Sequence, residues 1–407
     1  MTKPFFVNNQ SVLTYNQLLV SVDQACTYYP YLKSNSLFDH WINFIKALVC
    51  NKPITLIDSD MQDTELAALK LANLINIEVD CPKHNFHSFS ELLERIKKST
   101  SEIIIFTSGT TGQPKKVIHS VQSLTRAVRI SKKHEADVWG FAFNPTHMAG
   151  IQVFFQALLN VNTMINLFGF SKSAIFDAFK TYKITHISAT PTFYRLLIPP
   201  DFPLKSVERV TLGGEKASSN LISEIKRVFT NAIVSNIYAS TEAGSLFISQ
   251  GEVFSIPNNL NELILFDNDE ILIHECLLGK SDSLTLENGF YRTGDLIEWI
   301  DQSAKKFRFK SRKNELINIG GYKVNPSEVE DIIMSFPQVA AVIVFGKQNS
   351  VLGNILCADI QLKQEQTLTE TELRLELKKL LQEFKIPRKI KFVDQIELTR
   401  TGKIKRI

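Results

Sequence analysis

The stretch Ile103–Val117 limits what this chain can fold into more than any other part of the sequence. It opens with three isoleucines and a phenylalanine, an apolar run that predicts a buried strand. The segment Thr107–Gly112 then consists only of Thr, Ser and Gly, and Lys115 follows closely. Glycines let a backbone approach a ligand, hydroxyls and amides donate hydrogen bonds, and a lysine adds positive charge. The stretch therefore predicts a strand that leads into a phosphate-binding loop.

The spacing within this loop excludes a Walker A motif. That motif needs four residues between its glycines and then Lys followed by Ser or Thr. Here only two residues separate Gly109 from Gly112, and Gln113 comes next. Alone, six such residues would also suit an ordinary flexible turn. The sequence thus indicates a phosphate loop of another type, and the rest of the chain has to support it.

Composition narrows the class of protein. The chain has 407 residues, 44% hydrophobic and 22% charged, which suits a globular enzyme of two or more domains. A net charge of +4 does not argue for a nucleic-acid partner, and the basic C-terminal segment is interleaved with apolar residues. Five scattered cysteines without a C-x-x-C pair favour reduced thiols and a cytoplasmic location. We find neither a signal-peptide pattern nor an apolar run long enough to cross a membrane, and we expect no membrane partner.

Alternation of strand and helix patterns before residue 252 predicts an α/β fold with largely parallel sheets flanked by helices. Short alternating runs in residues 252–310 predict an antiparallel subdomain, and residues 311–407 predict a small α+β domain. We therefore divide the chain into a large N-terminal domain, 1–310, and a C-terminal domain, 311–407. In open α/β sheets ligands bind at the carboxyl ends of strands, where the small polar residues of this chain gather.

Six polar clusters in addition to the phosphate loop stand out in chain order. They are Asn144–Gly150, Gly213–Glu215, Tyr238–Gly244, Tyr291–Leu296, the run from Phe309 through Asn314 to Pro326, and Thr399–Arg406. In the third cluster a carboxylate, Glu242, adjoins Thr241, a pair that can place Mg²⁺ and a hydroxyl on one phosphate. Each cluster also has a plain structural interpretation: Glu242 could begin a helix, Asp295 could belong to a turn, His147 could be a core histidine, and Lys403 could be solvated.

Together and in this order, the clusters resemble the motifs of the adenylate-forming (AMP-binding) enzyme superfamily, and most closely its stand-alone acyl- and aryl-CoA synthetases. The resemblance covers about three quarters of the chain, and the region before the phosphate loop is shorter than the family usually has. Three positions depart from the family pattern, in which Gly is usual at Ala239 and Ser311, and Asp or Lys is usual at Asn314.

The resemblance implies ATP-dependent conversion of a small-molecule carboxylic acid to an acyl-adenylate, then transfer to a thiol, with Mg²⁺ as cofactor. The thiol is that of coenzyme A or, alternatively, of the phosphopantetheine on an acyl carrier protein. A nucleotide-binding protein without catalysis and a luciferase-type oxygenase are further alternatives. In this family the small C-terminal domain is mobile and rotates between the two half-reactions.

The resemblance also assigns roles by residue. Catalysis falls to Lys403, Glu242, Thr107 and His147, the metal to Glu242, the hinge to Asn314, and the thiol-acceptor loop to Gly320, Gly321 and Lys323. ATP and AMP binding falls to Thr107, Ser108, Gly109, Thr110, Thr111, Gly112, Lys115, Gly213, Gly214, Glu215, Tyr238, Ala239, Ser240, Thr241, Asp295, Phe309, Arg312 and Lys403. The apolar segment Gly150–Leu159, with Phe154 and Phe155, favours an apolar or aromatic acyl group.

Overall fold

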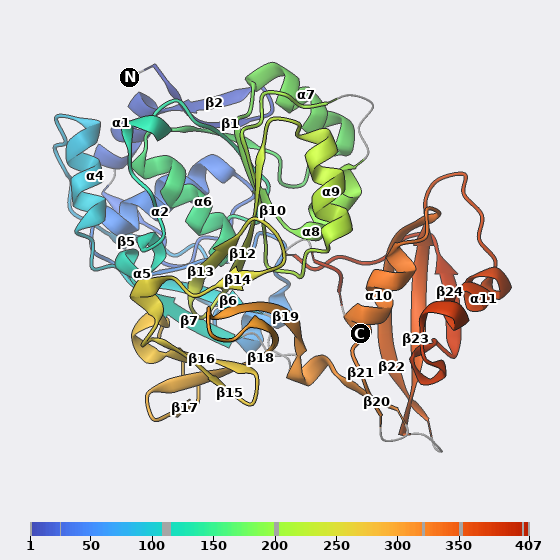
Figure 1. Ribbon diagram of the computed structural model, residues 1–407. Helices are drawn as coiled ribbons and strands as arrows, with labels where there is room; N and C mark the ends of the chain where they lie inside the picture. Colours follow the sequence, from blue (N-terminus) through green and yellow to red (C-terminus); the bar gives the residue numbers. More distant parts are fainter. Residues whose placement is uncertain are drawn as a thin grey trace.

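The chain forms a large N-terminal domain and a small C-terminal domain (Figure 1). The structure is a computed structural model, which describes residues 2–24, 26–107, 115–198, 203–319, 322–349, 353–400 and 403–405. The predicted α/β fold class is confirmed, because parallel strands dominate the main sheet and helices cover both of its faces.

The main sheet has eight strands in the order β13-β12-β11-β10-β8-β9-β1-β2. Strands β1, β9, β8, β10, β11 and β12 run parallel, while the edge strands β13 and β2 run antiparallel to their neighbours. Their bounds are β1 Pro4–Asn8, β2 Ser11–Thr14, β8 Val138–Phe141, β9 Thr163–Asn166, β10 His186–Ala189, β11 Arg209–Gly213, β12 Ile233–Ser240 and β13 Gly244–Ser249. The residues that β1, β9, β8, β10 and β11 bury are mostly apolar, as expected for strands covered on both faces.

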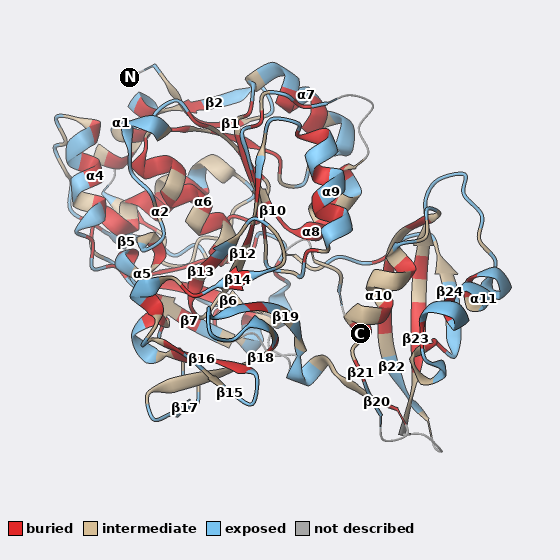
Figure 2. Ribbon diagram, viewed as in Figure 1, coloured by how far each residue is buried: buried red, intermediate tan, exposed pale blue. Residues whose placement is uncertain are grey.

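Helices cover the two faces of this sheet and bury two separate cores (Figure 2). One face carries α1 Tyr15–Asp23, α2 Leu37–Val49, α4 Phe89–Lys97, α5 Val121–Thr125 and α6 Met148–Leu159, and the other carries α7 Lys172–Tyr182, α8 Pro191–Leu197 and α9 Ser219–Val228. Ser120 caps α5, and its hydroxyl accepts from the Ser123 backbone N–H. The described residues include no helix long and apolar enough to cross a membrane.

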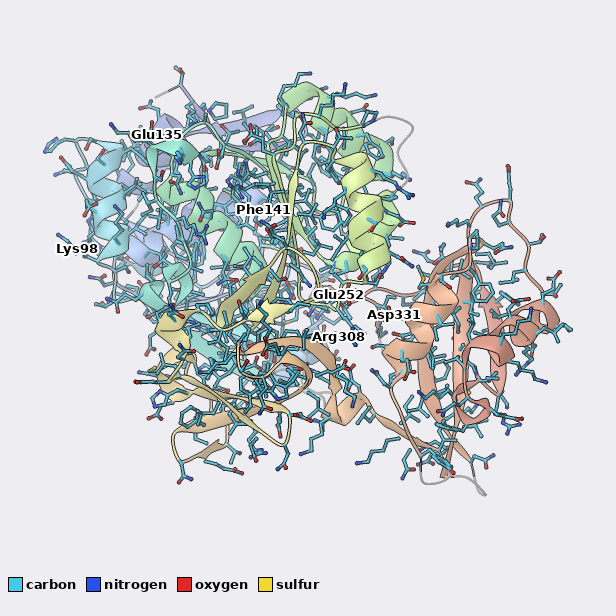
Figure 3. All side chains as sticks on the ribbon, viewed as in Figure 1. Lys98, Glu135, Phe141, Glu252, Arg308 and Asp331 are labelled. Carbon is cyan, nitrogen blue, oxygen red and sulfur yellow. The ribbon has the colours of Figure 1, made fainter. Side chains whose placement is uncertain are left out.

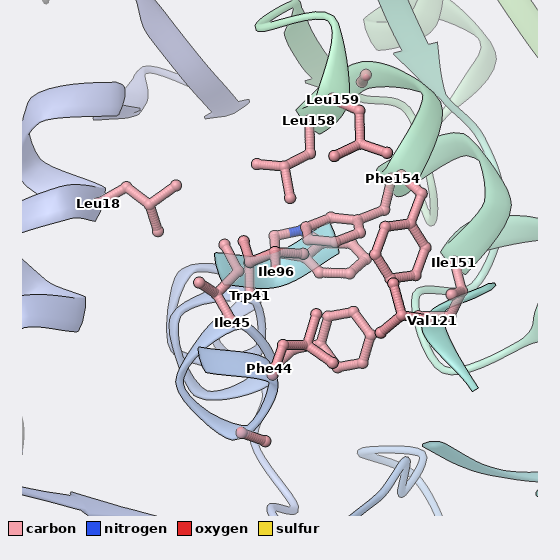
Figure 4. Close-up of a cluster of buried hydrophobic side chains, with 14 of the residues drawn as sticks. Leu18, Trp41, Phe44, Ile45, Ile96, Val121, Ile151, Phe154, Leu158 and Leu159 are labelled. Carbon is pink, nitrogen blue, oxygen red and sulfur yellow. The ribbon is translucent and has the colours of Figure 1, made fainter. Parts of the chain in front are cut away.

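An aromatic cluster fills the first core (Figure 4). Trp41 of α2 stacks on Phe154 of α6 with ring centroids 4.3 Å apart, and Phe44 meets both Phe154 and Phe155 edge-on. Each of these rings is fully buried. Phe154 and Phe155 therefore form core contacts and line no substrate cavity, so the argument for an apolar acid that rested on them was wrong.

Smaller sheets complete the N-terminal domain. Strands β4 Ile54–Thr55, β6 Ile103–Thr107 and β7 Lys115–His119 form one, and β3 Thr27–Tyr28 with β5 Val79–Asp80 forms another. The antiparallel sheet contains β14 Phe254–Ser255, β15 Ile264–Asp267, β16 Glu270–His274, β17 Leu286–Glu287, β18 Phe290–Asp301 and β19 Lys306–Arg312. Helix α3 Asp63–Ala68 and the 3₁₀ turns η1 Lys132–His134, η2 Asn258–Leu260 and η3 Glu275–Leu277 lie between these strands in the sequence.

The C-terminal domain has its own core, beneath α10 Pro326–Met334 and α11 Glu370–Leu380. Its strands are β20 Ile317–Ile319, β21 Tyr322–Val324, β22 Val339–Asn349, β23 Gly353–Leu362 and β24 Lys389–Val393, with the turn η5 Glu383–Lys385 before β24. The turn η4 Lys313–Glu315 joins this domain to β19. Asp331 lies on the side of α10 that faces the large domain (Figure 3), 3.2 Å from Lys216.

Candidate active site

The hairpin β6–β7 places two predicted phosphate ligands opposite each other. Thr107 ends β6, Lys115 begins β7, and the two are direct partners in the antiparallel ladder. They therefore stand at the two ends of the predicted phosphate loop. The predicted ligands between them, Ser108, Gly109, Thr110, Thr111 and Gly112, lie outside the described residues.

The C-terminal tail brings Lys403 to the carboxyl end of β11, almost two hundred residues away in the sequence. A Cβ atom placed on Gly214 would stand 3.4 Å from the Lys403 Nζ and 3.1 Å from its Cε. Gly214 also has a φ of +83°, which side chains rarely adopt, so this position favours glycine. An antiparallel bridge between Leu398 and Ile404 shapes the tail turn. The structure thus places the predicted catalytic lysine beside the predicted adenine loop.

Charged groups surround the Lys403 ammonium. Burial lowers the pKa of Lys403, while the carboxylates of Glu215 and Glu242 act in the opposite direction. No hydrogen bond or ion pair within the described part of the chain occupies the Glu242 side chain. A carboxylate near Lys403 that has no partner among the described residues suits Mg²⁺, which prefers hard oxygen ligands. These residues therefore fit the metal that the sequence predicts.

A second cluster joins Asp295 to two other predicted nucleotide ligands. The Arg312 Nε–H donates to one Asp295 oxygen at 2.7 Å, and the Tyr238 hydroxyl donates to the other at 2.7 Å. The charge of Asp295 raises the pKa of Arg312, and burial followed by Asp295 raises that of Tyr238. Phe309 stacks on the Tyr238 ring with centroids 4.5 Å apart. Four predicted residues from strands β12, β18 and β19, Asp295 among them, therefore lie in one cluster.

The other predicted adenine-side residues lie at the ends of β11 and β12. The Glu215 carboxylate accepts from both the backbone N–H and the hydroxyl of Thr192 at the start of α8, at 2.9 and 2.8 Å. Gly213 ends β11, and Ala239 and Ser240 end β12 beside Thr241. The Ser240 hydroxyl accepts from the backbone N–H of Ala243 at 3.1 Å. In these contacts Glu215 and Ser240 shape the loops in which they lie.

His147 has a buried partner that the sequence did not reveal. Its Nε2 lies within ion-pair distance of an oxygen of Asp58, a residue that follows β4, at 3.3 Å, and makes no hydrogen bond within the described residues. Asp58 also accepts from Asn144 Nδ2 at 2.8 Å and from the Thr146 hydroxyl. Burial by itself would raise the pKa of Asp58, but His147, Thr146 and Asn144 together lower it to about 2. Asp58 is thus a charged group that orients the predicted substrate-side histidine.

Two further residues hold the loop that contains Thr241 and Glu242. His119 at the end of β7 places its Nε2 2.8 Å from the Thr241 carbonyl oxygen, and Arg126 donates to the Ala243 carbonyl at 2.6 Å. The backbone N–H of Gly279 donates to the Glu242 carbonyl at 2.7 Å. Sequence motifs could not indicate these residues, because their partners are backbone carbonyls of a loop that is distant in the sequence.

The predicted hinge and thiol-acceptor residues lie in and beyond the turn η4. Strand β19 continues through Ser311 and Arg312, and η4 begins at Lys313. Asn314 is exposed in the middle of η4. Lys323 is exposed on β21, and no hydrogen bond or ion pair joins it to the described part of the large domain. Gly320 and Gly321 lie outside the described residues.

Comparison with known proteins identifies the family. A family profile described as AMP-binding enzyme matches residues 45–262, more than half of the chain. The chain belongs to the AMP-binding enzyme family. A second profile, AMP-binding enzyme C-terminal domain, matches residues 328–403. The resemblance stated from the motifs is confirmed, and the catalytic-lysine candidate falls within the second match.

Named relatives of this AMP-binding enzyme include CoA ligases. It is 25% identical over 446 residues to the 2-succinylbenzoate–CoA ligase of Staphylococcus epidermidis, covering 98% of this chain and 93% of that protein. It is 27% identical over 343 residues to the oxalate–CoA ligase of Saccharomyces cerevisiae, but spans only 63% of that protein's length. The o-succinylbenzoate CoA synthetase of Bacillus subtilis, solved with its acyl-adenylate intermediate, shares the fold with a TM-score of 0.73 and 18% identity, over 98% of this chain and 94% of that one.

Proposed function

We propose that this AMP-binding enzyme activates a carboxylic acid with ATP as an acyl-adenylate and transfers the acyl group to the thiol of coenzyme A. The single observation that carries the proposal is the position of Lys403, held by the C-terminal tail against Gly214. A lysine with a displaced pKa among carboxylates, at the carboxyl ends of parallel strands, is typical of a reacting site. The CoA ligases among the relatives support the same reaction.

In the proposed first step, a carboxylate oxygen of the acid attacks the α-phosphorus of ATP, and pyrophosphate leaves. Two anions must approach each other, so the protein contributes alignment and positive charge more than covalent chemistry. We assign to Lys403 the stabilisation of charge that develops between the carboxylate and the α-phosphate. Mg²⁺, held through Glu242, would neutralise phosphate charge when bound.

The remaining predicted ligands position the nucleotide. Thr107, Lys115 and the loop between them take the terminal phosphates, and Thr241 takes the α-phosphate. We assign the ribose hydroxyls to Asp295. Its buried carboxylate is held in place by hydrogen bonds from the Tyr238 hydroxyl and the Arg312 guanidinium. Arg312 takes part in the same contact. His147, oriented by Asp58, lies on the side where the acid binds.

A cavity beside the Lys403 segment supports an acid with an apolar body. It has a volume of about 460 Å³ and lies at the carboxyl ends of β8, β9 and β10. Its lining is mainly apolar and includes Ala142, Leu167, Phe193 and Leu398, with Thr399 and Arg400 of the tail at one side. We assign the apolar part of the acid to this cavity and give no role in binding it to Phe154 and Phe155, which lie in the core.

The proposal is tested by ATP–pyrophosphate exchange over a panel of carboxylic acids, with and without Mg²⁺. Exchange that depends on one class of acid supports adenylation, and no exchange with any acid contradicts it. The acyl-adenylate formed with the active acid is then offered free coenzyme A or a carrier protein bearing phosphopantetheine. The acceptor that yields a thioester distinguishes the two alternatives.

The cavity assignment has its own test. Ala142→Leu should raise the KM for the acid while leaving the KM for ATP unchanged. A raised KM for coenzyme A instead would assign the cavity to the thiol arm.

A further inference from the structure

Two histidines and an aspartate meet at the amino-terminal ends of central strands of the main sheet. The candidate active site lies at the opposite, carboxyl-terminal ends of these strands. His186 begins β10, Asp137 immediately precedes β8, and His134 ends the turn η1. Because β8 and β10 are neighbouring parallel strands, their amino ends lie together here, while their carboxyl ends face the cavity. Nothing in the proposed adenylation chemistry uses these three side chains.

The donor atoms are close enough to share one ion. Asp137 Oδ2 lies 2.8 Å from His134 Nδ1 and 3.3 Å from His186 Nε2, and all three donor atoms lie within 4.8 Å of one another. Zinc ligands at about 2.0–2.2 Å in a tetrahedron stand roughly 3.3 Å apart. The two histidines and the carboxylate therefore need only a small adjustment to bind one metal ion.

His186 supplies an independent reason to expect a cation. Its side chain is 4% exposed, and its Nε2 is buried without a hydrogen-bond partner among the described residues. The other ring nitrogen, Nδ1, lies 2.9 Å from the Thr185 hydroxyl, which fixes the plane of the ring. The Thr185 hydroxyl donates its own hydrogen to the Val138 carbonyl at 3.2 Å. Its oxygen can therefore accept a hydrogen bond from the Nδ1–H of His186. In that tautomer a bare Nε2 lone pair faces the carboxylate of Asp137.

The surroundings hold the three side chains in place and leave one open side. The backbone N–H of Asp137 donates to the His134 carbonyl, and the buried Asn162 side chain donates to the same carbonyl. Metal-ligating histidines characteristically have a second partner that fixes their orientation, as Thr185 does here. The His134 side chain is 23% exposed, which gives water access to a fourth coordination position.

We propose that His134, Asp137 and His186 form a binding site for a divalent transition-metal ion of the Zn²⁺ class, with water as the fourth ligand. Two imidazoles and one carboxylate suit Zn²⁺ and Co²⁺ better than Mg²⁺, which prefers oxygen ligands. A bound ion joins η1 to the starts of β8 and β10 and so stabilises this edge of the sheet. The site is separate from Glu242, and the proposal does not rest on the proposed function.

The test is equilibrium dialysis of the reduced, chelator-stripped full chain against Zn²⁺, with Mg²⁺ in excess to occupy oxygen-ligand sites. Visible absorption of the Co²⁺-loaded protein reports geometry and ligand type. We expect one tightly bound Zn²⁺ per chain, a tetrahedral Co²⁺ spectrum without a thiolate charge-transfer band, and a higher melting temperature with Zn²⁺. His186→Gln and Asp137→Asn should each weaken binding at least about tenfold, the lower end of the loss for an outer-shell partner.

His84→Gln is the matched control, since His84 lies outside the proposed site and its Nε2 is 3.5 Å from another potential metal ligand, Cys50 Sγ. It should leave Zn²⁺ binding unchanged. His134→Gln alters a partly exposed ligand and serves if the buried variants fail to fold, as judged by metal-free melting. Absence of Zn²⁺ binding would show a hydrogen-bonded His–Asp–His group only. Binding that survives His186→Gln or His134→Gln, or that is lost in His84→Gln, overturns the proposal.

Discussion

Arg400 anchors the segment that delivers Lys403, and its removal should change the balance between the two half-reactions. The Arg400 guanidinium donates to both oxygens of Glu65 in α3 at 2.9 and 2.7 Å, and its Nε lies 2.9 Å from Asp60. These ion pairs join the C-terminal tail to the large domain. The hydrogen bonds from Arg400 lower the pKa of Glu65, as expected when a cation stabilises the carboxylate.

The size of the expected change in the rate ratio follows from how far the Arg400 ion pairs are exposed to solvent. The Arg400 side chain is 33% exposed and those of Glu65 and Asp60 are 35% and 64% exposed, so solvent screens both pairs. Exposed pairs contribute about 0.2–1 kcal/mol each, and we take about 0.5–1.5 kcal/mol for the two together. If the C-terminal domain has one arrangement for adenylation and another for thioester formation, the ratio of the two rates follows the ratio of the two populations. Arg400→Gln should therefore lower that rate ratio by about two- to twelvefold, whichever arrangement dominates.

The assay is pyrophosphate exchange beside single-turnover acyl transfer from preformed adenylate, at low and high salt. Salt should lower the ratio in the wild type and have less effect in Arg400→Gln, because exposed ion pairs are screened. Glu65→Gln keeps the side-chain oxygen that caps α3 and should reproduce most of the change in the rate ratio. The double variant Arg400→Gln with Glu65→Gln should show no larger change than Arg400→Gln alone. Arg308→Gln is the control, since its 2.7 Å pair with Glu298 joins neighbouring strands of one domain. Equal losses in both half-reactions, or a ratio like that of the control, would refute the reasoning.

Three other predictions test the assigned roles and the pH dependence of stability. Lys403→Ala should lower adenylate formation by about 10²–10³ and affect reaction of a supplied adenylate with the thiol much less; wild-type pyrophosphate exchange in the mutant would exclude a catalytic role. Asn314→Pro fixes one backbone angle in η4 and restricts Lys313, so adenylation should survive while thioester formation falls at least about tenfold, or about 1.4 kcal/mol of barrier. Equal losses in a protein that melts cooperatively would show that Asn314 is not the hinge. Burial lowers the pKa of His40 from 6.5 to about 4, so the unfolded chain alone takes up this proton between those values and stability falls as pH falls through that window. Urea unfolding should therefore show a loss of about 2 kcal/mol between pH 7 and pH 5 that His40→Gln lacks, and an identical loss in the mutant would contradict the assignment.

The sequence by itself determined the fold class and the order of the site motifs. Apolar runs of strand length followed by Gly, Ser and Thr indicate where a parallel strand ends, and ligands gather at such ends for a general geometric reason. This is why Thr107, Gly214 and Thr241 stood out before their positions were known, whereas Lys403 was assigned by the family resemblance of its motif.

Tertiary structure decided which side chains meet. Phe154 packs against Trp41 and Phe155 against Phe44 because α2 and α6 cover the same face of the sheet, and no local pattern distinguishes a core aromatic ring from a pocket ring. Asp58 reaches His147 across almost ninety residues, and His186 meets Asp137 through the pairing of β8 with β10. Local sequence periodicity shows which residues share a face of one element. Contacts between distant elements depend on strand order and helix packing, which local periodicity leaves open.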